Sequence, residues 1–125
     1  MSTQRSAVHV RMPAERSSIT HRFKIEDTKG YIIAGTYMDG SPGEIFIVAS
    51  KVGTTEKGLL HALAVVVSIA LQHGVPLTKI TNKLKGLQFE PQGITSNPDI
   101  RITKSLVDYT ARWLELKFLG EVSQT

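Results

Sequence analysis

Apolar and polar residues alternate along the first fifty positions of the chain. The run 19–25 alternates apolar or aromatic residues with basic or hydroxyl-bearing ones, and a period of two is typical of a strand with one buried face. Two more apolar runs, 31–38 and 44–49, follow short connections that contain Asp and Gly, the first of them at 27–30. The pattern predicts an antiparallel β-meander of three strands.

The pattern changes to a helical period after these strands. Thr54 or Thr55 is a suitable N-cap for a helix over 56–73, which Gly74 and Pro76 would end. The middle of this helix is apolar nearly all round, which predicts a central helix covered by the sheet and by other helices or another subunit. Its apolar run is shorter than the roughly 20 residues of a membrane span, so we expect a buried core helix.

Two further helices are predicted, over 77–85 and about 103–119, with an irregular segment at 87–100 between them. We expect these residues to point inward: Leu77, Ile80, Leu84, Leu106, Tyr109, Trp113 and Leu116. The predicted fold class is α+β, a three-stranded antiparallel meander followed by three helices packed on one face of the sheet.

Length and composition restrict the possible functions. The chain has 125 residues, of which 41% are hydrophobic, and this suits one domain. We expect a flexible N-terminal arm at 1–18, a single domain at 19–120 and a tail at 121–125. The arm has no apolar run typical of a signal peptide, so we expect a cytoplasmic protein without a membrane partner. With no cysteine, the chain has no disulfide, thiolate metal site or cysteine nucleophile.

The charged and histidine residues give few strong signals. The net charge of +4 is a mild excess, which argues against nucleic acid as the partner. Two of the four histidines, His61 and His73, are twelve positions apart on one predicted helix, too far apart to share an ion. We expect no metal site, no cofactor and no catalytic residues, because no acid–base pair or nucleophile triad stands out.

Three groups of residues are candidates for binding an anion. Lys51 and Thr54 lie before the first predicted helix, where a phosphate or a plain glycine turn with a threonine cap would fit. Arg112 either forms a surface ion pair with Asp108 or joins Arg101 and Lys117 around an anionic ligand. Phe89 either stacks on the base of a nucleotide ligand or fills the hydrophobic core.

The segment Thr95-Ser96-Asn97-Pro98-Asp99 resembles the signature of the TSCPD domain, the C-terminal module of adenosylcobalamin-dependent (class II) ribonucleotide reductases. The resemblance runs from about Arg11 to Leu119. We expect the module to be a free-standing chain here. It also includes Pro13 to Arg16, Ser18 to Phe23, Gly30-Tyr31, Pro42 to Ile47, Gln72 to Leu77, Phe89-Glu90-Pro91, Asn97 to Arg101, Asp108-Tyr109 and Arg112 to Leu114.

This resemblance implies a binding module more than an enzyme. The reductases hold their radical chemistry in a large barrel that this chain lacks. The signature cysteine is Asn97 here, and the cysteine pair that often follows the module is missing after Gly120. We therefore do not expect electron delivery by this polypeptide.

We expect a non-catalytic nucleotide-binding or interaction module. Phe89 would stack on a base, Asn97 and Asp99 would bind hydroxyls or base edges, and Arg101 and Arg112 would hold phosphate. A second hypothesis is a phage-type sponge that sequesters cyclic ADP-ribose or cyclic oligonucleotide immune signals, because the anti-Thoeris sponges are similar in size and use a comparable order of residues.

Two more hypotheses involve larger partners. The chain could be the small subunit of a split cobalamin-dependent reductase that joins a separate catalytic chain. A nucleic-acid binder would use Arg22 and Lys24 of the first strand with Lys79 and Lys83. In every case we expect a homo-oligomer, because so apolar a central helix is difficult to cover in a small domain.

Overall fold

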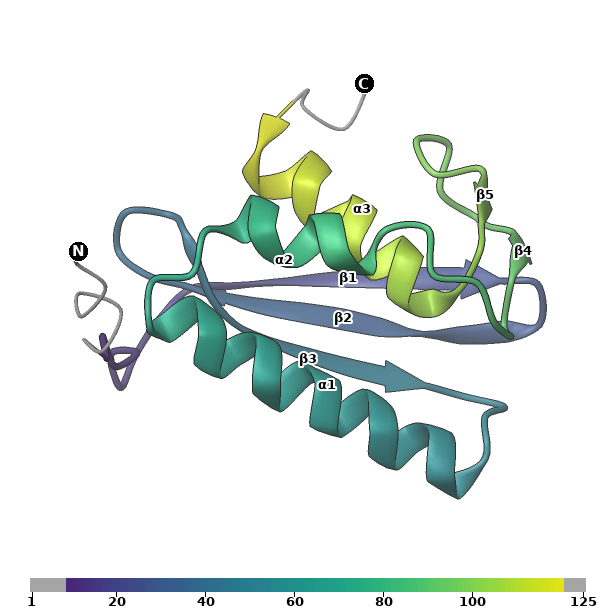
Figure 1. Cartoon of the computed structure of the whole chain (residues 1–125), viewed down its shortest axis with the longest axis horizontal. Helices are drawn as coiled ribbons and strands as arrows, with labels where there is room; N and C mark the ends of the chain where they lie inside the picture. The colour runs from purple at the N-terminus through teal and green to yellow at the C-terminus, as the bar shows by residue number, and fades with distance from the viewer. Residues whose placement is uncertain (1–8, 121–125) are drawn as a thin grey trace.

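Three antiparallel strands form the sheet on which the rest of the molecule is arranged. The computed structural model describes residues 9–120. Its strands β1 (Ser18–Ile25), β2 (Thr28–Thr36) and β3 (Pro42–Ala49) pair in the order β1-β2-β3 (Figure 1). Alternate residues point inward, so that Ile45 and Ile47 are buried while Phe46 is exposed. The predicted meander is confirmed.

The first hairpin is tighter than the sequence predicts. The expected turn covers 27–30, but Thr28 pairs with Ile25 and only Glu26 and Asp27 connect the strands. Gly30 therefore lies inside β2, where an added Cβ would be 2.8 Å from Cζ of Phe23. The absence of a side chain at Gly30 allows the Phe23 ring to pack against the backbone.

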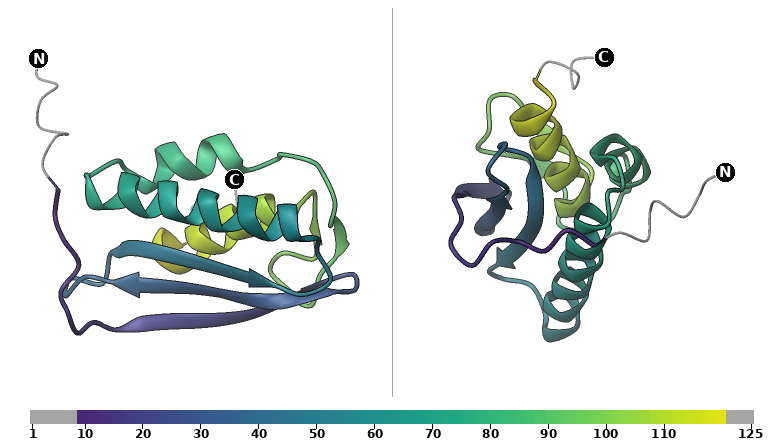
Figure 2. Two further views of the ribbon diagram at one scale, coloured as in Figure 1. Left: turned by 90° about the horizontal axis from the view of Figure 1, so that it is seen from below. Right: turned by 90° about the vertical axis from the view of Figure 1, so that its left-hand side faces the viewer.

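All three helices lie on one face of the sheet, as predicted, and the other face carries no helix (Figure 2). They are α1 (Thr54–Gln72), α2 (Leu77–Leu84) and α3 (Leu106–Phe118). The N-cap of α1 is Gly53, without a side-chain hydrogen bond, so the prediction of a threonine cap is wrong. In α3, Ser105 caps the helix by accepting a hydrogen bond from the amide of Asp108 at 2.9 Å.

The central helix of the fold is α3. Nine of its residues are buried: Leu106, Val107, Asp108, Tyr109, Thr110, Ala111, Trp113, Leu114 and Glu115. Its aromatic residues face β1, where the ring centroids of Tyr109 and Phe23 are 5.8 Å apart. On its other side α3 packs against α2. The helix is therefore enclosed between the sheet and a second helix.

The more apolar helix, α1, is covered on one side only. It lies along β3, where Ser68 Oγ accepts a hydrogen bond from the amide of Ile45 at 2.9 Å. Its buried residues are Ala64, Val67 and Leu71. Within this chain only the stripe of α1 that faces β3 is covered, so the expected coverage by other helices is not found, and coverage by another subunit stays a prediction. By length and composition alone α1 would also suit a membrane span.

Part of the predicted N-terminal arm is attached to the domain. Val10 donates a backbone hydrogen bond to the carbonyl of Gln72 at 2.8 Å, and Arg16 forms an ion pair with Glu44 at 2.6 Å. The stretch 9–17 thus runs from the end of α1 across the end of the sheet where β2 and β3 are connected. The rest of the arm, 1–8, and the tail, 121–125, lie outside the described residues.

Candidate functional site

The segment between α2 and α3 contains a small two-stranded ribbon where the sequence predicts an irregular loop. In it, β4 (Gly93–Ile94) pairs antiparallel with β5 (Ile102–Thr103). The ribbon is joined to the sheet, since the amide of Ser96 donates to the carbonyl of Lys24 at 3.0 Å. Residues 95–99, which we call the signature turn, therefore lie beside the end of β1.

The backbone amides of the signature turn donate hydrogen bonds within the protein. The amide of Asn97 donates to Oγ1 of Thr95 at 3.0 Å, and the amide of Asp99 donates to Oδ1 of Asn97 at 2.9 Å. The amide of Ile100 donates to the carbonyl of Asn97 at 3.1 Å. The amide of Ser96 is bonded to the carbonyl of Lys24. The four amides of Ser96, Asn97, Asp99 and Ile100 are therefore not free to bind an anion. Recognition of an anion here must therefore come from side chains.

The side chain of Asn97 also reaches the core. Its Nδ2 donates to the phenolic oxygen of Tyr109 at 3.2 Å, and that oxygen is 2.7 Å from Nε2 of His21. The His21 ring stacks on Trp113, with centroids 5.0 Å apart. Both ends of the Asn97 amide are thus engaged within the chain, although the sequence predicts a ligand-binding role for this residue.

Burial sets the charge states of the two aromatic groups in this chain of contacts. Burial lowers the pKa of His21, and the nearby charge of Lys117 lowers it further. Burial also raises the pKa of Tyr109, and the Asn97 hydrogen bond opposes this rise only in part. A neutral His21 whose Nε2 accepts the phenolic proton of Tyr109 fits both directions.

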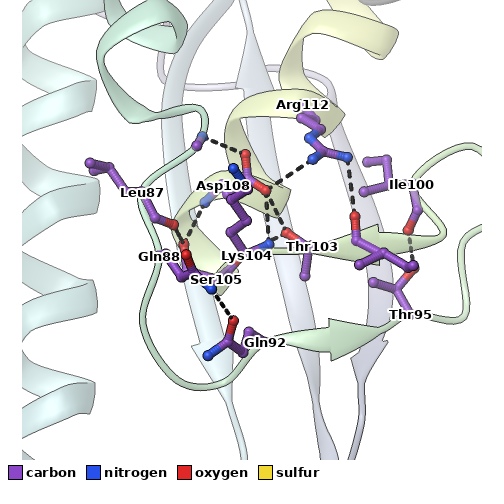
Figure 3. A network of polar contacts seen from close by, with 12 residues as sticks. Leu87, Gln88, Gln92, Thr95, Ile100, Thr103, Lys104, Ser105, Asp108 and Arg112 are labelled. Carbon is purple, nitrogen blue, oxygen red and sulfur yellow. Dashed lines mark hydrogen bonds and ion pairs between the residues drawn. The ribbon is translucent and has the colours of Figure 1, made fainter.

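Asp108 is the centre of a second network (Figure 3). Its Oδ1 accepts from the amide of Gly86 at 2.7 Å, and Oδ2 accepts from Oγ1 of Thr103 at 2.9 Å and the amide of Lys104 at 3.0 Å. Nη2 of Arg112 lies 3.2 Å from Oδ2. The side chain of Asp108 is only 1% exposed. This pair therefore ties the 86–104 segment to α3 and is not a plain surface ion pair.

The charge of Asp108 is stabilised by these partners. Burial by itself raises the pKa of the carboxyl group. The hydrogen bonds from Lys104, Gly86 and Thr103 and the charge of Arg112 outweigh burial, so that the pKa is lowered overall. A carboxylate with several donors is favoured in its ionised form.

A hollow of about 410 Å³ opens beside the signature turn. We call it the ribbon hollow. It is lined by Ile94, Thr95, Ser96, Asn97, Pro98, Arg101 and Ile102. Ile94 is 67% exposed and Ile102 is 65% exposed, and the two are paired across the ribbon. Arg101 is exposed at the same place. The hollow thus combines an apolar wall with one guanidinium group.

Arg112 lies behind this hollow. Its Nη1 donates to the carbonyl of Ile102 at 3.2 Å, and its Nη2 pairs with Asp108. About a third of its side chain is exposed, 35%. Two of its donor groups are therefore committed within the chain, and Arg101 is the better placed arginine for a ligand.

The other predicted site residues lie elsewhere. Phe89 lines an apolar groove of about 290 Å³ between α1 and the 86–92 segment, where Glu56 and Leu59 are also found. Lys51 and Thr54 are exposed near the start of α1 and line neither this groove nor the ribbon hollow. The structure brings together Asn97 and Arg101, with Asp99 in the same turn, but does not bring Phe89, Lys51 or Thr54 to them.

Sequence reasoning missed the two isoleucines of the ribbon hollow. Ile94 directly precedes the signature turn and Ile102 is the third residue after it, which is a hairpin pattern that could have been noticed. Their exposure depends on the ribbon lying at the end of the sheet. Over residues 9–120, no group of three or more His, Asp or Glu side chains is arranged to hold a metal ion.

Comparison with known proteins identifies relatives over most of the chain. The sequence profile of the TSCPD domain matches residues 5–118. The chain is 50% identical over 110 residues to a vitamin B12-dependent ribonucleotide reductase of Rhodopirellula baltica, covering 88% of this chain and 11% of that protein. It is 42% identical over 112 residues to a protein of the same description from Streptantibioticus cattleyicolor, covering 90% of this chain and 19% of that one.

A more distant relative has the same description. The vitamin B12-dependent ribonucleotide reductase of Bradyrhizobium diazoefficiens is 34% identical over 111 residues, or 88% of this chain and 9% of that protein. The chain thus spans less than a fifth of the length of the curated relatives it matches. No solved structure matches the chain significantly.

Proposed function

Because this chain belongs to the TSCPD domain family, related to the C-terminal module of class II ribonucleotide reductases, we propose that it is a non-catalytic module that binds a nucleotide in the ribbon hollow. The observation that carries the proposal is the pairing of an apolar wall with an exposed arginine at one hollow, next to the signature turn. Arginine suits phosphate because it offers a planar set of donors.

Each part of a nucleotide finds a matching group there. The exposed faces of Ile94 and Ile102 supply an apolar surface for a base. Arg101 supplies the charge for a phosphate, and Ser96 adds a hydroxyl group. Asp99, which is exposed in the same turn, can accept hydrogen bonds from ribose hydroxyls. Because the turn amides are already bonded, Arg101 carries most of the phosphate recognition.

A thermal-shift screen tests this proposal. Adenine mono-, di- and triphosphates should raise the melting temperature, because a ligand at ten times its dissociation constant adds about 1.4 kcal/mol to the native state. For a domain of this size that corresponds to a rise of about 5 °C. Arg101→Ala should remove the shift, whereas Arg11→Ala, which changes an exposed arginine of the arm, should keep it. Flat melting curves with every nucleotide would refute the proposal.

The same screen separates nucleotide binding from the sponge and split-reductase hypotheses. Cyclic ADP-ribose and cyclic dinucleotides are included as further ligands, and a shift confined to them would favour the sponge function over general nucleotide binding. A small subunit of a split reductase would instead co-purify with a large cobalamin-dependent chain when the two are expressed together. The Arg101→Ala variant would leave that association unchanged.

We also propose that the chain associates with a second copy of itself through α1. Four exposed apolar residues follow one another at alternating spacings of three and four positions: Leu59, Ala62, Val66 and Ile69. This is the spacing at which two helices pack along a common seam. A single helix with such a stripe is self-complementary about a two-fold axis, so one surface serves both copies.

A further inference from the structure

One face of the sheet carries no helix (Figure 2), and we call it the outer sheet face. It displays aromatic residues. Tyr31 of β2 is 43% exposed and Phe46 of β3 is 47% exposed, and Val48 beside them is 55% exposed. Strand alternation sends these side chains outward and buries their neighbours. Exposed aromatic rings on a sheet without a covering layer are unusual for a purely structural face, which normally carries polar residues.

The register places the two rings close together. Tyr31 is directly opposite Val48, and Phe46 is directly opposite Ile33. Tyr31 and Phe46 are therefore diagonal neighbours on adjacent strands, about 7–8 Å apart between Cα atoms. On its other side, Tyr31 is directly opposite Arg22 of β1. The outer sheet face thus presents two rings side by side with a guanidinium group next to one of them.

Positive charge lies on the Tyr31 side of this face. Lys24 and Lys29 face each other across β1 and β2, one row beyond Arg22 and Tyr31. A shallow hollow of about 500 Å³ next to Tyr31 is lined by Arg22, Lys29, Gly30, Val48, Ala49, Ser50 and Lys57, without an acidic residue.

The acidic residues nearby do not neutralise this charge. Glu44, two positions before Phe46 on β3, is already paired with Arg16. Glu26 and Asp27 lie in the turn after β1, where Oε2 of Glu26 accepts a hydrogen bond from the amide of Ile94 at 2.7 Å. Over residues 9–120, no ion pair joins Arg22, Lys24, Lys29 or Lys57 to an acidic residue.

From this arrangement we propose that the outer sheet face binds single-stranded nucleic acid. Two successive bases stack on Tyr31 and Phe46, because every base offers a π-face to an aromatic ring. The phosphates that join and flank these two nucleotides contact the four cations. A duplex cannot use this surface in the same way, because its bases are already stacked in pairs.

This proposal differs from the nucleic-acid surface that the sequence predicts. The sequence groups Arg22 and Lys24 with Lys79 and Lys83, and its small net charge argues against such a partner. Lys79 and Lys83 are on α2, in the helical layer on the opposite side of the sheet. The cations that accompany Arg22 and Lys24 are Lys29 of β2 and Lys57, which is on α1 but lines the hollow next to Tyr31. The aromatic residues are on β2 and β3.

Fluorescence anisotropy with labelled oligothymidylate and oligouridylate of about 12 nucleotides tests this inference. We expect dissociation constants of about 1–100 µM, and the two probes show whether DNA or RNA is preferred. The logarithm of the association constant should fall with the logarithm of salt concentration with a slope of about −2 to −3, as expected for four neutralised phosphates on a single strand. Tyr31→Ala and Phe46→Ala should each weaken binding about tenfold.

Matched variants distinguish stacking from general attraction. Phe89 is as exposed as Phe46, at 46% against 47%, but lies in the helical layer, so Phe89→Ala should leave oligonucleotide binding unchanged. Lys29→Gln should reduce the salt slope, whereas Lys79→Gln should not. Melting temperatures of all variants show that each remains folded, since every substituted residue is exposed.

Several results would overturn the inference. Equal or tighter binding of a duplex of the same length would show that stacking is not involved. Unchanged oligonucleotide binding by Tyr31→Ala and Phe46→Ala would also show that stacking is not involved. If the protein bound vesicles of phosphatidylserine and phosphatidylcholine but no oligonucleotide, the cations of the outer sheet face would serve to bind a lipid surface. The Arg101→Ala variant should bind oligonucleotides normally, so this inference and the nucleotide proposal succeed or fail separately.

Discussion

Nε2 of His21 lies 2.7 Å from the phenolic oxygen of Tyr109, which joins the first strand to the last helix. The two residues are 88 positions apart in the sequence. The same oxygen accepts a hydrogen bond from Asn97, so the signature turn is fastened to the core of the domain through one tyrosine. A ligand at the ribbon hollow would therefore contact a turn that the core already holds in place.

The burial of His21 makes the stability of the protein depend on pH. Because the folded-state pKa of His21 is below its ordinary value of 6.5, the unfolded chain binds a proton more readily than the native chain. Stability should be fully present above about pH 6.5 and should fall as the pH decreases below it. Urea unfolding at about pH 7.5 and 5.5 measures this loss, which should be smaller in His21→Gln. Titrations common to both chains cancel in the comparison, and an equal loss in both would contradict the prediction.

Asn97 and Tyr109 should be energetically coupled. Tyr109→Phe removes the oxygen that both Asn97 and His21 contact, and we expect it to lower the free energy of unfolding by about 1–3 kcal/mol. Asn97→Ala should cost about 1–2 kcal/mol, since the turn also loses the bond to the amide of Asp99. The double variant should cost less than the sum of the two, by at least about 0.5 kcal/mol. Strict additivity in urea unfolding would show that the contact contributes nothing.

Asp108 should be the most sensitive polar position of the domain. Asp108→Asn keeps the shape of the side chain but removes its charge, and this leaves Arg112 without its partner and several donors poorly matched. We expect a loss of about 2–4 kcal/mol in the free energy of unfolding. Asp27→Asn, a change of the same kind in the exposed turn after β1, should change it by less than about 0.5 kcal/mol.

Acid titration provides a second measurement at Asp108. Its folded-state pKa is below the ordinary value of 3.8, so its contribution to stability is present above that value and is lost as the pH falls further. The Asp108→Asn variant should therefore lose less stability than the wild-type protein below about pH 4. An equal loss of stability in the wild-type protein and in Asp108→Asn would contradict a lowered pKa of Asp108.

Self-association through α1 is tested by sedimentation velocity. The protein should sediment with twice the mass of its 13.7 kDa chain, and Val66→Glu should convert it to a monomer, because a buried unpaired charge is costly in an apolar seam. His61→Glu, which changes an exposed position of the same helix outside the 59–62–66–69 stripe, should remain a dimer. A monomeric wild-type protein would refute the proposal, and co-purification of a reductase chain through the same face would assign α1 to that partner.

The order and type of the main elements could be read from the sequence because they depend on neighbouring residues. Alternation around Phe23 and Ile47 predicts strands, and Gly74 with Pro76 ends α1 close to the predicted residue. The signature turn identified the family for the same reason, since its five residues are contiguous. The partners of Asn97 could not be read in this way, because Tyr109 and His21 approach it only after the chain has folded.

The sequence by itself determined which residues share a face of each strand and helix, because the periods of 2 and 3.6 residues are local properties of the backbone. It did not determine which face would be covered. The apolar pattern of α1 predicts a central position for that helix, yet α3 occupies the centre, although it carries Asp108, Thr110 and Glu115 into the core. Only the tertiary structure decided this, because coverage depends on contacts between elements far apart in the chain. The same contacts left Tyr31 and Phe46 without a covering layer and gave the domain its outer sheet face.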